Sequence, residues 1–180
     1  MPALELSLRP LTAADLGELL ALQSRCYGAD YLESRTSFEA KLAATEGRAT
    51  CWMAWRGLEA LAYAVALPVT EHTLPALNAP LCERVAQPEL LYLHDIAVAP
   101  EARSLGLAGR LLAQLTERAQ ALGLARLALI AVQGSVPYWS RQGFEPWPAT
   151  GVLAAKLASF GAEAQLMQRR LTVEAVGASR

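Results

Sequence analysis

Hydrophobic residues alternate with polar ones at the start of the chain and then take up helical spacing. Residues 4–10 (LELSLRP) alternate, which predicts a half-buried strand that ends at the proline. A Thr-x-x-Asp sequence opens 12–28, where apolar residues at helical spacing and a closing glycine predict a capped helix. Thr-x-x-Glu predicts a second, shorter helix over 36–44. Two strands are predicted at 49–55 and 58–67, joined in a tight hairpin at an Arg-Gly pair.

The middle of the chain contains a proline-rich loop and then a strand, a helix and a strand. Residues 68–88 hold four prolines and predict a long loop, which either covers a binding site or is a surface insertion. A central strand is predicted over 90–98, followed by an amphipathic helix that Gly123 ends. The apolar run over 124–132 predicts a strand that is buried on both faces.

The last third of the chain completes the predicted sheet. Ser135 is predicted to cap a short helix that a Gln-Gly pair closes, a strand begins at Phe144, and 164–173 suits a last strand. We therefore predict one α/β (α+β) domain over 1–180, with a core of about 4–173. Its mixed central sheet should have about six to seven strands, with helices on both faces.

Composition narrows the class of protein. A chain of 180 residues suits one domain that buries roughly two thirds of its unfolded surface. Hydrophobic residues make up 53%, yet no apolar run approaches the ~20 residues that cross a bilayer, and the start does not resemble a signal peptide. We expect a soluble, cytoplasmic protein without a membrane partner. Three cysteines without a CxxC pair predict no metal site, and the net charge of −1 gives no support for a nucleic-acid partner.

The turn after the central strand carries the first candidate chemistry. The first backbone N–H groups of a helix have no partner within it and can bind an anion. Gly106 lets the backbone approach such an anion closely, Ala108 avoids bulk where the helix begins, and Arg103 adds a permanent charge. The segment is either a cradle for a pyrophosphate or an ordinary strand-to-helix loop.

Two motifs together resemble the GNAT superfamily of acyl-CoA-dependent N-acetyltransferases. The [Q/R]-x-x-G-x-[G/A] signature is matched over 103–108, and the aromatic element that ends in Gly-Phe is matched over 138–144. The resemblance implies a GNAT-like fold and direct transfer of an acetyl group, in a ternary complex, from acetyl-CoA to an amine of a small molecule or peptide. It implies no metal, and it is compatible with a homodimer. The alternative that stays open is a non-catalytic acyl-CoA-binding sensor or regulatory module.

The resemblance also implies where coenzyme A binds, namely in a cleft where the central strand splays from the next parallel strand. Pantetheine would pair with the backbone of Ile96, Ala97 and Val98, and Trp139 would pack along it. The residues implied at the pyrophosphate are Arg103, Ser104, Leu105, Gly106, Leu107, Ala108, Gly109 and Arg110.

Two residues are candidates for the proton transfers. Alternation places His94 on the same face as Ile96, and the serotonin N-acetyltransferase branch has a histidine at this position, so His94 is either a base or a satisfied core histidine. The same alternation predicts that Asp95 faces the opposite way. Trp139 stands where many members of the family have a tyrosine, and an indole cannot act as the acid. The neighbouring Tyr138 is therefore the candidate acid.

An acidic, aromatic loop is the candidate for binding the acceptor amine. Tyr27, Asp30 and Tyr31 lie close together in the sequence, with Glu33 two residues further on. Carboxylates and ring faces both attract a cation. The loop either recognises the amine or is simply solvated, and the sequence does not identify the acceptor.

Overall fold

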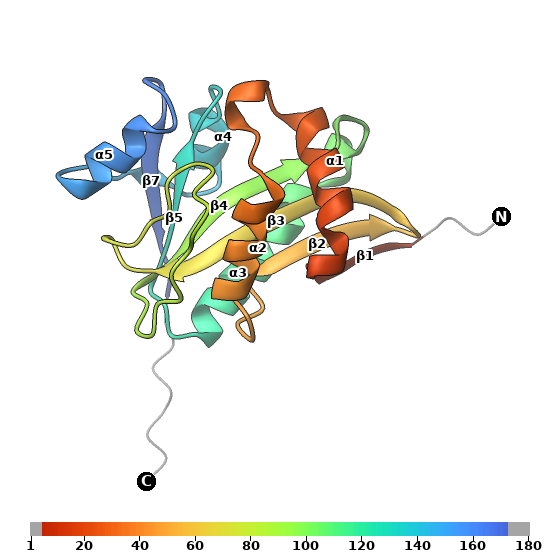
Figure 1. Ribbon diagram of the computed structural model, residues 1–180, viewed down its shortest axis with the longest axis horizontal. Coiled ribbons are helices and arrows are strands. Elements are labelled where there is room, and N and C mark those ends of the chain that lie inside the picture. The colour runs from red at the N-terminus through yellow and green to blue at the C-terminus, as the bar shows by residue number, and fades with distance from the viewer. Residues whose placement is uncertain (1–4, 173–180) are drawn as a thin grey trace, which may run out of the picture.

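The computed structural model describes residues 5–172, which form a seven-stranded mixed sheet with helices on both faces (Figure 1). The strand order is β1-β2-β3-β4-β5-β7-β6, and only the β4–β5 pair is parallel. The predicted fold class is confirmed. The strands are β1 (Leu6–Pro10), β2 (Cys51–Arg56), β3 (Glu59–Val69), β4 (Leu90–Val98), β5 (Arg126–Ala131), β6 (Glu145–Pro146) and β7 (Gln165–Arg170).

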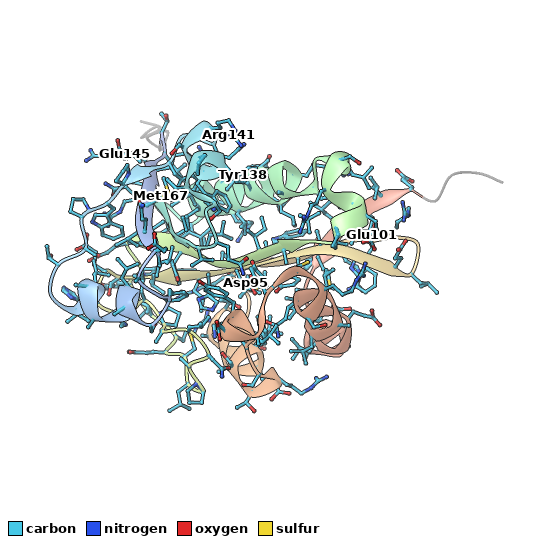
Figure 2. The ribbon with its side chains drawn as sticks, turned by 90° about the horizontal axis from the view of Figure 1, so that it is seen from above. Asp95, Glu101, Tyr138, Arg141, Glu145 and Met167 are labelled. Atoms are coloured by element: carbon cyan, nitrogen blue, oxygen red, sulfur yellow. The ribbon has the colours of Figure 1, made fainter. Side chains whose placement is uncertain are left out.

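Helices α1 and α2 cover one face of the sheet, and α3 and α4 cover the other (Figure 2). On α3 the apolar stripe of Leu107, Leu111 and Leu115 is at most 1% exposed, which holds this helix on the sheet. Within residues 5–172 no helix is long and apolar enough to span a membrane. The α-helices are α1 (Leu16–Cys26), α2 (Arg35–Ala44), α3 (Leu107–Ala121), α4 (Val136–Arg141) and α5 (Val152–Ala158). The 3₁₀ helices are η1 (Ala13–Asp15), η2 (Ala29–Tyr31) and η3 (Pro100–Leu105).

Several element ends differ from the predictions. The cap predicted at Thr36 is wrong, because Ser34 caps α2 and its side chain accepts a hydrogen bond from the Ser37 amide at 3.2 Å. Ser135 precedes α4 but makes no capping hydrogen bond with its side chain. The strand predicted from Phe144 is only two residues long. The predicted ends at 4 and 173 lie outside the described residues.

The central strand β4 separates from β5 halfway along its length. The two strands pair only between Leu91–Leu93 and Leu127–Leu129, so β4 has no β5 partner from His94 to Val98. The register between β4 and β3 shifts at the same point. Leu93 pairs with Ala66 of β3, and Asp95, two residues further along β4, pairs with the adjacent Val65. His94 is therefore the extra residue of a β-bulge, which bends and twists the strand locally.

Candidate functional site

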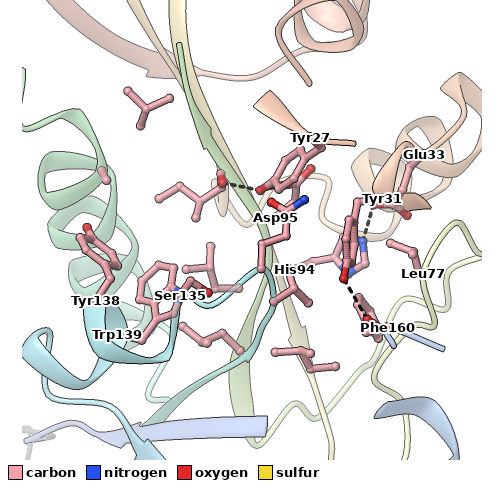
Figure 3. Close-up of a pocket in the computed structure, with 18 residues that line it drawn as sticks. Tyr27, Tyr31, Glu33, Leu77, His94, Asp95, Ser135, Tyr138, Trp139 and Phe160 are labelled. Atoms are coloured by element: carbon pink, nitrogen blue, oxygen red, sulfur yellow. Dashed lines mark hydrogen bonds and ion pairs between the residues drawn. The ribbon is translucent and has the colours of Figure 1, made fainter. Parts of the chain in front are cut away.

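A pocket of about 290 Å³ lies where β4 and β5 separate (Figure 3). Tyr138 and Trp139 of α4 line one side of it, while Tyr31, Glu33 and Phe160 line the other. The floor is formed by the part of β4 that has no β5 partner. Segments distant in the sequence therefore meet at one cavity, as in most ligand-binding sites.

The backbone of β4 is exposed to this pocket. His94 as a whole residue is partly exposed, yet its side chain is only 1% exposed, so the exposed atoms belong to the main chain. Ile96 and Val98, two of the residues expected to pair with pantetheine, line the pocket, and Ala97 is buried outside it. The Ile96 and Val98 carbonyls accept hydrogen bonds from Tyr27 and Cys26, and other main-chain groups on the edge of β4 that β5 leaves can bond to a ligand.

The predicted orientation of Asp95 is wrong, and the bulge is the physical reason. The extra residue breaks the period of two, so the side chains of His94 and Asp95 both contact the segment that connects α1 and α2. Figure 2 shows Asp95 on the side of the sheet that these helices cover. Asp95 is bonded to the end of α1, because the Tyr27 hydroxyl, from the residue that ends this helix, lies 2.8 Å from its carboxylate.

A buried charge cluster holds His94. Glu33 Oε1 lies 2.6 Å from His94 Nε2, and Glu33 Oε2 lies 3.0 Å from Lys41 Nζ. All three side chains are at most 2% exposed. Ser37 and the backbone amide of Asn78 also donate to Glu33 Oε2, at 3.0 and 2.8 Å. Burial acts to raise the pKa of Glu33, but His94 and Lys41 outweigh it and lower this pKa to about 2.

The ionised Glu33 fixes which nitrogen of His94 carries a proton. A carboxylate only accepts hydrogen bonds, so the ring N–H is assigned to Nε2, which donates to Glu33. Nδ1 is then the ring's acceptor, and it is buried without a hydrogen-bond partner among the residues of the described chain. A carboxylate therefore orients the ring and fixes its tautomer.

Asp95 forms a second buried polar cluster beside the first. Tyr63 Oη donates to Asp95 Oδ2 at 2.7 Å, and Tyr27 Oη lies 2.8 Å from Asp95 Oδ1 and 2.6 Å from the Ile96 carbonyl oxygen. Burial raises the pKa of Asp95 to about 6, although the tyrosine hydrogen bonds and His94 oppose this shift. Asp95 also lines the pocket.

The start of α3 has the features of an anion site. Gly106 adopts the left-handed conformation (φ 68°), and its carbonyl accepts the first intrahelical bond, from Arg110 at 3.1 Å. The amides of Leu107, Ala108 and Gly109 therefore have no acceptor within the helix. Of the remaining predicted residues, Arg103, Ser104 and Leu105 are exposed on η3, and Ala108 lines the pocket.

The two aromatic residues of α4 form the opposite wall. Trp139 is 7% exposed, and its ring packs edge-on against Tyr138 and Phe144, with centroids 4.9 and 5.5 Å apart. Both Tyr138 and Trp139 line the pocket. Burial raises the pKa of Tyr138. Trp139 is therefore a packed wall of the pocket, with the ring of Tyr138 against it.

The acceptor side differs in part from the sequence-based expectation. Tyr27 and Tyr31 line the pocket, but Asp30 is exposed and lies outside it. Pro68, predicted to begin the loop, belongs to β3 instead, whereas the other three prolines lie in the loop after it. This loop reaches the pocket, since Leu77 lines it. The sequence offered no signal for Phe160, which reaches the site from beyond α5. Within residues 5–172 there is no cluster of His, Cys, Asp and Glu that could hold a metal.

Known proteins share this architecture. The ribosomal-protein-S18-alanine N-acetyltransferase from Escherichia coli is 16% identical with a TM-score of 0.67, over 98% of this chain and 99% of that one. The loading GNATL domain of CurA from Lyngbya majuscula is 12% identical with a TM-score of 0.75, over 92% and 98%. The PaiA N-acetyltransferase from Thermoplasma acidophilum, in complex with coenzyme A, is 13% identical with a TM-score of 0.67, over 93% and 99%.

Comparison by sequence gives the family directly. No curated protein matches significantly. The model of the Acetyltransferase (GNAT) family, however, matches residues 16–144, which is most of the chain. This match includes the bulge on β4, the start of α3 and both aromatic residues of α4. The chain therefore belongs to the GNAT family of acetyltransferases.

Proposed function

We propose that this protein transfers an acyl group, in the simplest case acetyl, from an acyl-coenzyme A to an amine of a small molecule or peptide. The observation that carries the proposal is the pocket where β4 leaves β5. It brings exposed strand backbone and a carboxylate-oriented histidine to one cavity, next to the start of α3. The N-acetyltransferases with the same fold, one of them in complex with coenzyme A, support this choice of donor.

The residues present fit coenzyme A. The amides of residues 107–109 have no acceptor within the helix and can bind the pyrophosphate, with Arg103 and Arg110 supplying positive charge nearby. The backbone of 96–98 can pair with the pantetheine amides, and Trp139 gives that arm an apolar wall. The bound donor supplies the thioester carbon that the amine attacks.

His94 is the proposed base. An alkylamine has a pKa near ~10 and arrives protonated, so a proton has to leave before nitrogen attacks. His94 is one of the pocket residues, its Nδ1 has no hydrogen-bond partner among the residues that the structure describes, and Glu33 stabilises the positive charge that the ring gains. The rings of Tyr27 and Tyr31 line the same side and can contact the ammonium group. We leave Asp30 out of the proposed site because it lies outside the pocket.

The test is acetyl transfer from acetyl-CoA to pooled amines, with mass spectrometry of the products and calorimetry of coenzyme A binding. We expect one class of amine to gain an acetyl group. Replacing His94 with glutamine should lower kcat/KM about 100-fold, in the range of a lost general base. The matched control is His72→Gln, because His72 is exposed and does not line this pocket.

Two outcomes would contradict the proposal. Absence of coenzyme A binding at saturating concentration would remove its basis. Tight binding without transfer to any amine would instead support the sensor or regulatory module. Equal activity of the His94 and His72 variants would refute the assignment of the base while leaving the transferase intact.

A further inference from the structure

Asp95 is part of a hydrogen-bonded chain that runs from the sheet interior to the pocket. Tyr63, which is fully buried on β3, donates to one carboxylate oxygen at 2.7 Å. Tyr27 lies 2.8 Å from the other oxygen and 2.6 Å from the carbonyl of Ile96. Tyr27 lines the pocket, and Figure 3 shows its hydroxyl directed toward β4. Asp95 and Tyr27 therefore both belong to the pocket, and the phenol of Tyr27 is hydrogen-bonded to the Asp95 carboxyl group.

The hydrogen-bonded chain of Tyr63, Asp95 and Tyr27 can hold one proton in addition to the two phenol hydrogens. The Tyr27 hydroxyl has a single hydrogen but two neighbouring oxygens within hydrogen-bond distance, one from Asp95 and one from Ile96. When Asp95 is ionised, the Tyr27 hydroxyl can donate to its carboxylate. When Asp95 is protonated, Asp95 can donate to Tyr27 Oη while the phenol donates to the Ile96 carbonyl, so that both contacts are hydrogen bonds.

We propose that Asp95 stores a proton and that Tyr27 delivers it to the sulfur of the departing coenzyme A. This inference rests on the proposed function and names the acid of that reaction, a role for which the sequence offered only Tyr138. Within the described part of the chain no carboxylate is hydrogen-bonded to the Tyr138 hydroxyl, so its proton would have to be restored by solvent rather than by a neighbouring acid.

The step balances in atoms and charge. The amine, after His94 has taken its first proton, forms the new N–C bond, and the C–S bond then breaks with the electron pair staying on sulfur. Tyr27 gives its proton to that sulfur and receives the proton of Asp95. The second proton, lost by the nitrogen as the amide forms, returns Asp95 to its protonated state.

The acidities favour this direction of transfer. A thiol has a pKa of about 8.5, whereas burial raises the pKa of Asp95 only to about 6, so Asp95 is the stronger acid and the transfer to sulfur is downhill. Burial raises the pKa of Tyr27 well above its ordinary value. The phenol alone would therefore be a poor donor, and it needs the carboxyl group behind it.

The charged and titratable groups around Asp95 come from three sides. Tyr27 and Cys26 lie at the end of α1, and Tyr63 lies on β3. His94 is its neighbour on β4 and acts to lower its pKa, while the ionised Glu33 acts to raise it. Because Glu33 is already paired with His94 and Lys41, the carboxyl that titrates at about pH 6 is that of Asp95.

The experiment compares two acetyl donors, acetyl-CoA and phenyl thioacetate, whose aromatic thiol leaves without help from an acid. With acetyl-CoA, Tyr27→Phe and Asp95→Asn should each lower the rate about 100-fold, the usual size of general-acid catalysis. With phenyl thioacetate both variants should come within about threefold of the wild type, since a better leaving group needs less acid. Asparagine keeps the hydrogen-bonding shape of Asp95 but has no proton to deliver.

Tyr138→Phe is the matched loss of a phenol from the same pocket. Whatever the rate of this variant, we expect the ratio of wild-type to Tyr138→Phe activity to be the same with acetyl-CoA and with phenyl thioacetate. The proposal would be overturned, and the acid assigned to Tyr138, if Tyr138→Phe lost more activity with acetyl-CoA than with phenyl thioacetate while Tyr27→Phe did not. A loss in Tyr27→Phe that persists with phenyl thioacetate would make Tyr27 a structural residue and overturn it as well.

The pH profile gives a readout that a structural role would not move. The ratio of wild-type to Asp95→Asn activity should fall as pH rises through about 6, because Asp95 loses its proton in this range. In Tyr63→Phe this fall should move to higher pH, since the Tyr63 hydrogen bond lowers the pKa of Asp95. A ratio that is independent of pH would refute the store.

Failure of the two proposals can be told apart. Transfer by the wild type with no effect of Tyr27→Phe would defeat the relay alone, whereas no transfer by the wild type would defeat the proposed function and the relay together. Infrared spectra of the wild type, recorded at pH 5 and pH 8, keep the proposal testable if Asp95→Asn does not fold. The carbonyl band of a protonated carboxyl should be present at pH 5 and lost at pH 8, and its absence at pH 5 overturns the proposal.

Discussion

Replacing Glu33 with glutamine would leave Lys41 buried without a counter-charge. The Lys41 side chain is 0% exposed, and Glu33 Oε2 is its only carboxylate partner among residues 5–172. Loss of one partner of a buried ion pair typically costs about 3–5 kcal/mol. We expect Tm to fall by roughly 6–20 °C in a domain of this size.

The same pair makes stability depend on pH in a defined window. The pKa of Glu33 is lower in the folded protein than in the unfolded chain, so its contribution is complete above about pH 4.5 and is lost as pH falls toward 2. Denaturant titrations of wild type and Glu33→Gln, monitored by circular dichroism across this range, should therefore converge at low pH. At neutral pH they should differ by the full ion-pair energy.

Two control variants decide whether the cost comes from an unpaired charge. Glu39→Gln removes an exposed carboxylate from α2, the helix that carries Lys41, and should change stability by less than about 0.5 kcal/mol. The double variant Glu33→Gln/Lys41→Met removes both charges and should recover most of the loss, because a neutral pair leaves no buried charge. A cost below about 1 kcal/mol for Glu33→Gln, or a double variant no more stable than the single, would refute the reasoning.

Three further predictions concern the helix end, the second carboxylate and the core. Gly106→Glu should weaken coenzyme A binding in calorimetry more than tenfold, because it places a negative charge at the pyrophosphate site. Gly106→Asn should retain most of the binding, because asparagine tolerates the left-handed conformation. Equal affinities of the two variants would contradict a pyrophosphate site at the start of α3. The pKa of Asp95 is raised on folding, so its contribution is present below about pH 3.8 and lost as pH rises through about 6. Together with Glu33 this predicts maximal stability near pH 4–5 in chemical denaturation, and Asp95→Asn should remove the decline above pH 5. Leu107→Ala should cost about 2–5 kcal/mol in the same assay, because Leu107 is 1% exposed on the buried stripe of α3.

Hydrophobic patterning predicted most of the fold because the helices and β1 have one buried face, whereas the central strands are apolar along most of their length. The stripe of α3 and the alternation of β1 both give their element type directly. Element ends were less predictable, since several residues can cap the same helix. Ser34 and Thr36 are both good caps, and only the packing of the preceding loop decides that Ser34 is used.

The site was predictable where it depends on local sequence and unpredictable where it depends on long-range pairing. The glycine of the α3 turn and the aromatic residues of α4 are visible as short motifs. The bond between Glu33 and His94 joins residues 61 positions apart, and no local pattern indicates it. Asp30 shows the opposite error, because its residue type suits an amine but its backbone carries it outside the pocket.

The bulge on β4 explains why alternation failed at the most important position. A half-buried strand reveals its register, because a slip of one residue would expose its apolar face. β4 is covered on both faces and is largely apolar, so an inserted residue leaves no trace in its pattern. Its effect is large, because it places His94 and Asp95 on one face at the point where β5 departs. The proposed base and the proposed proton store are therefore adjacent in the chain and share one pocket, which strict alternation would forbid.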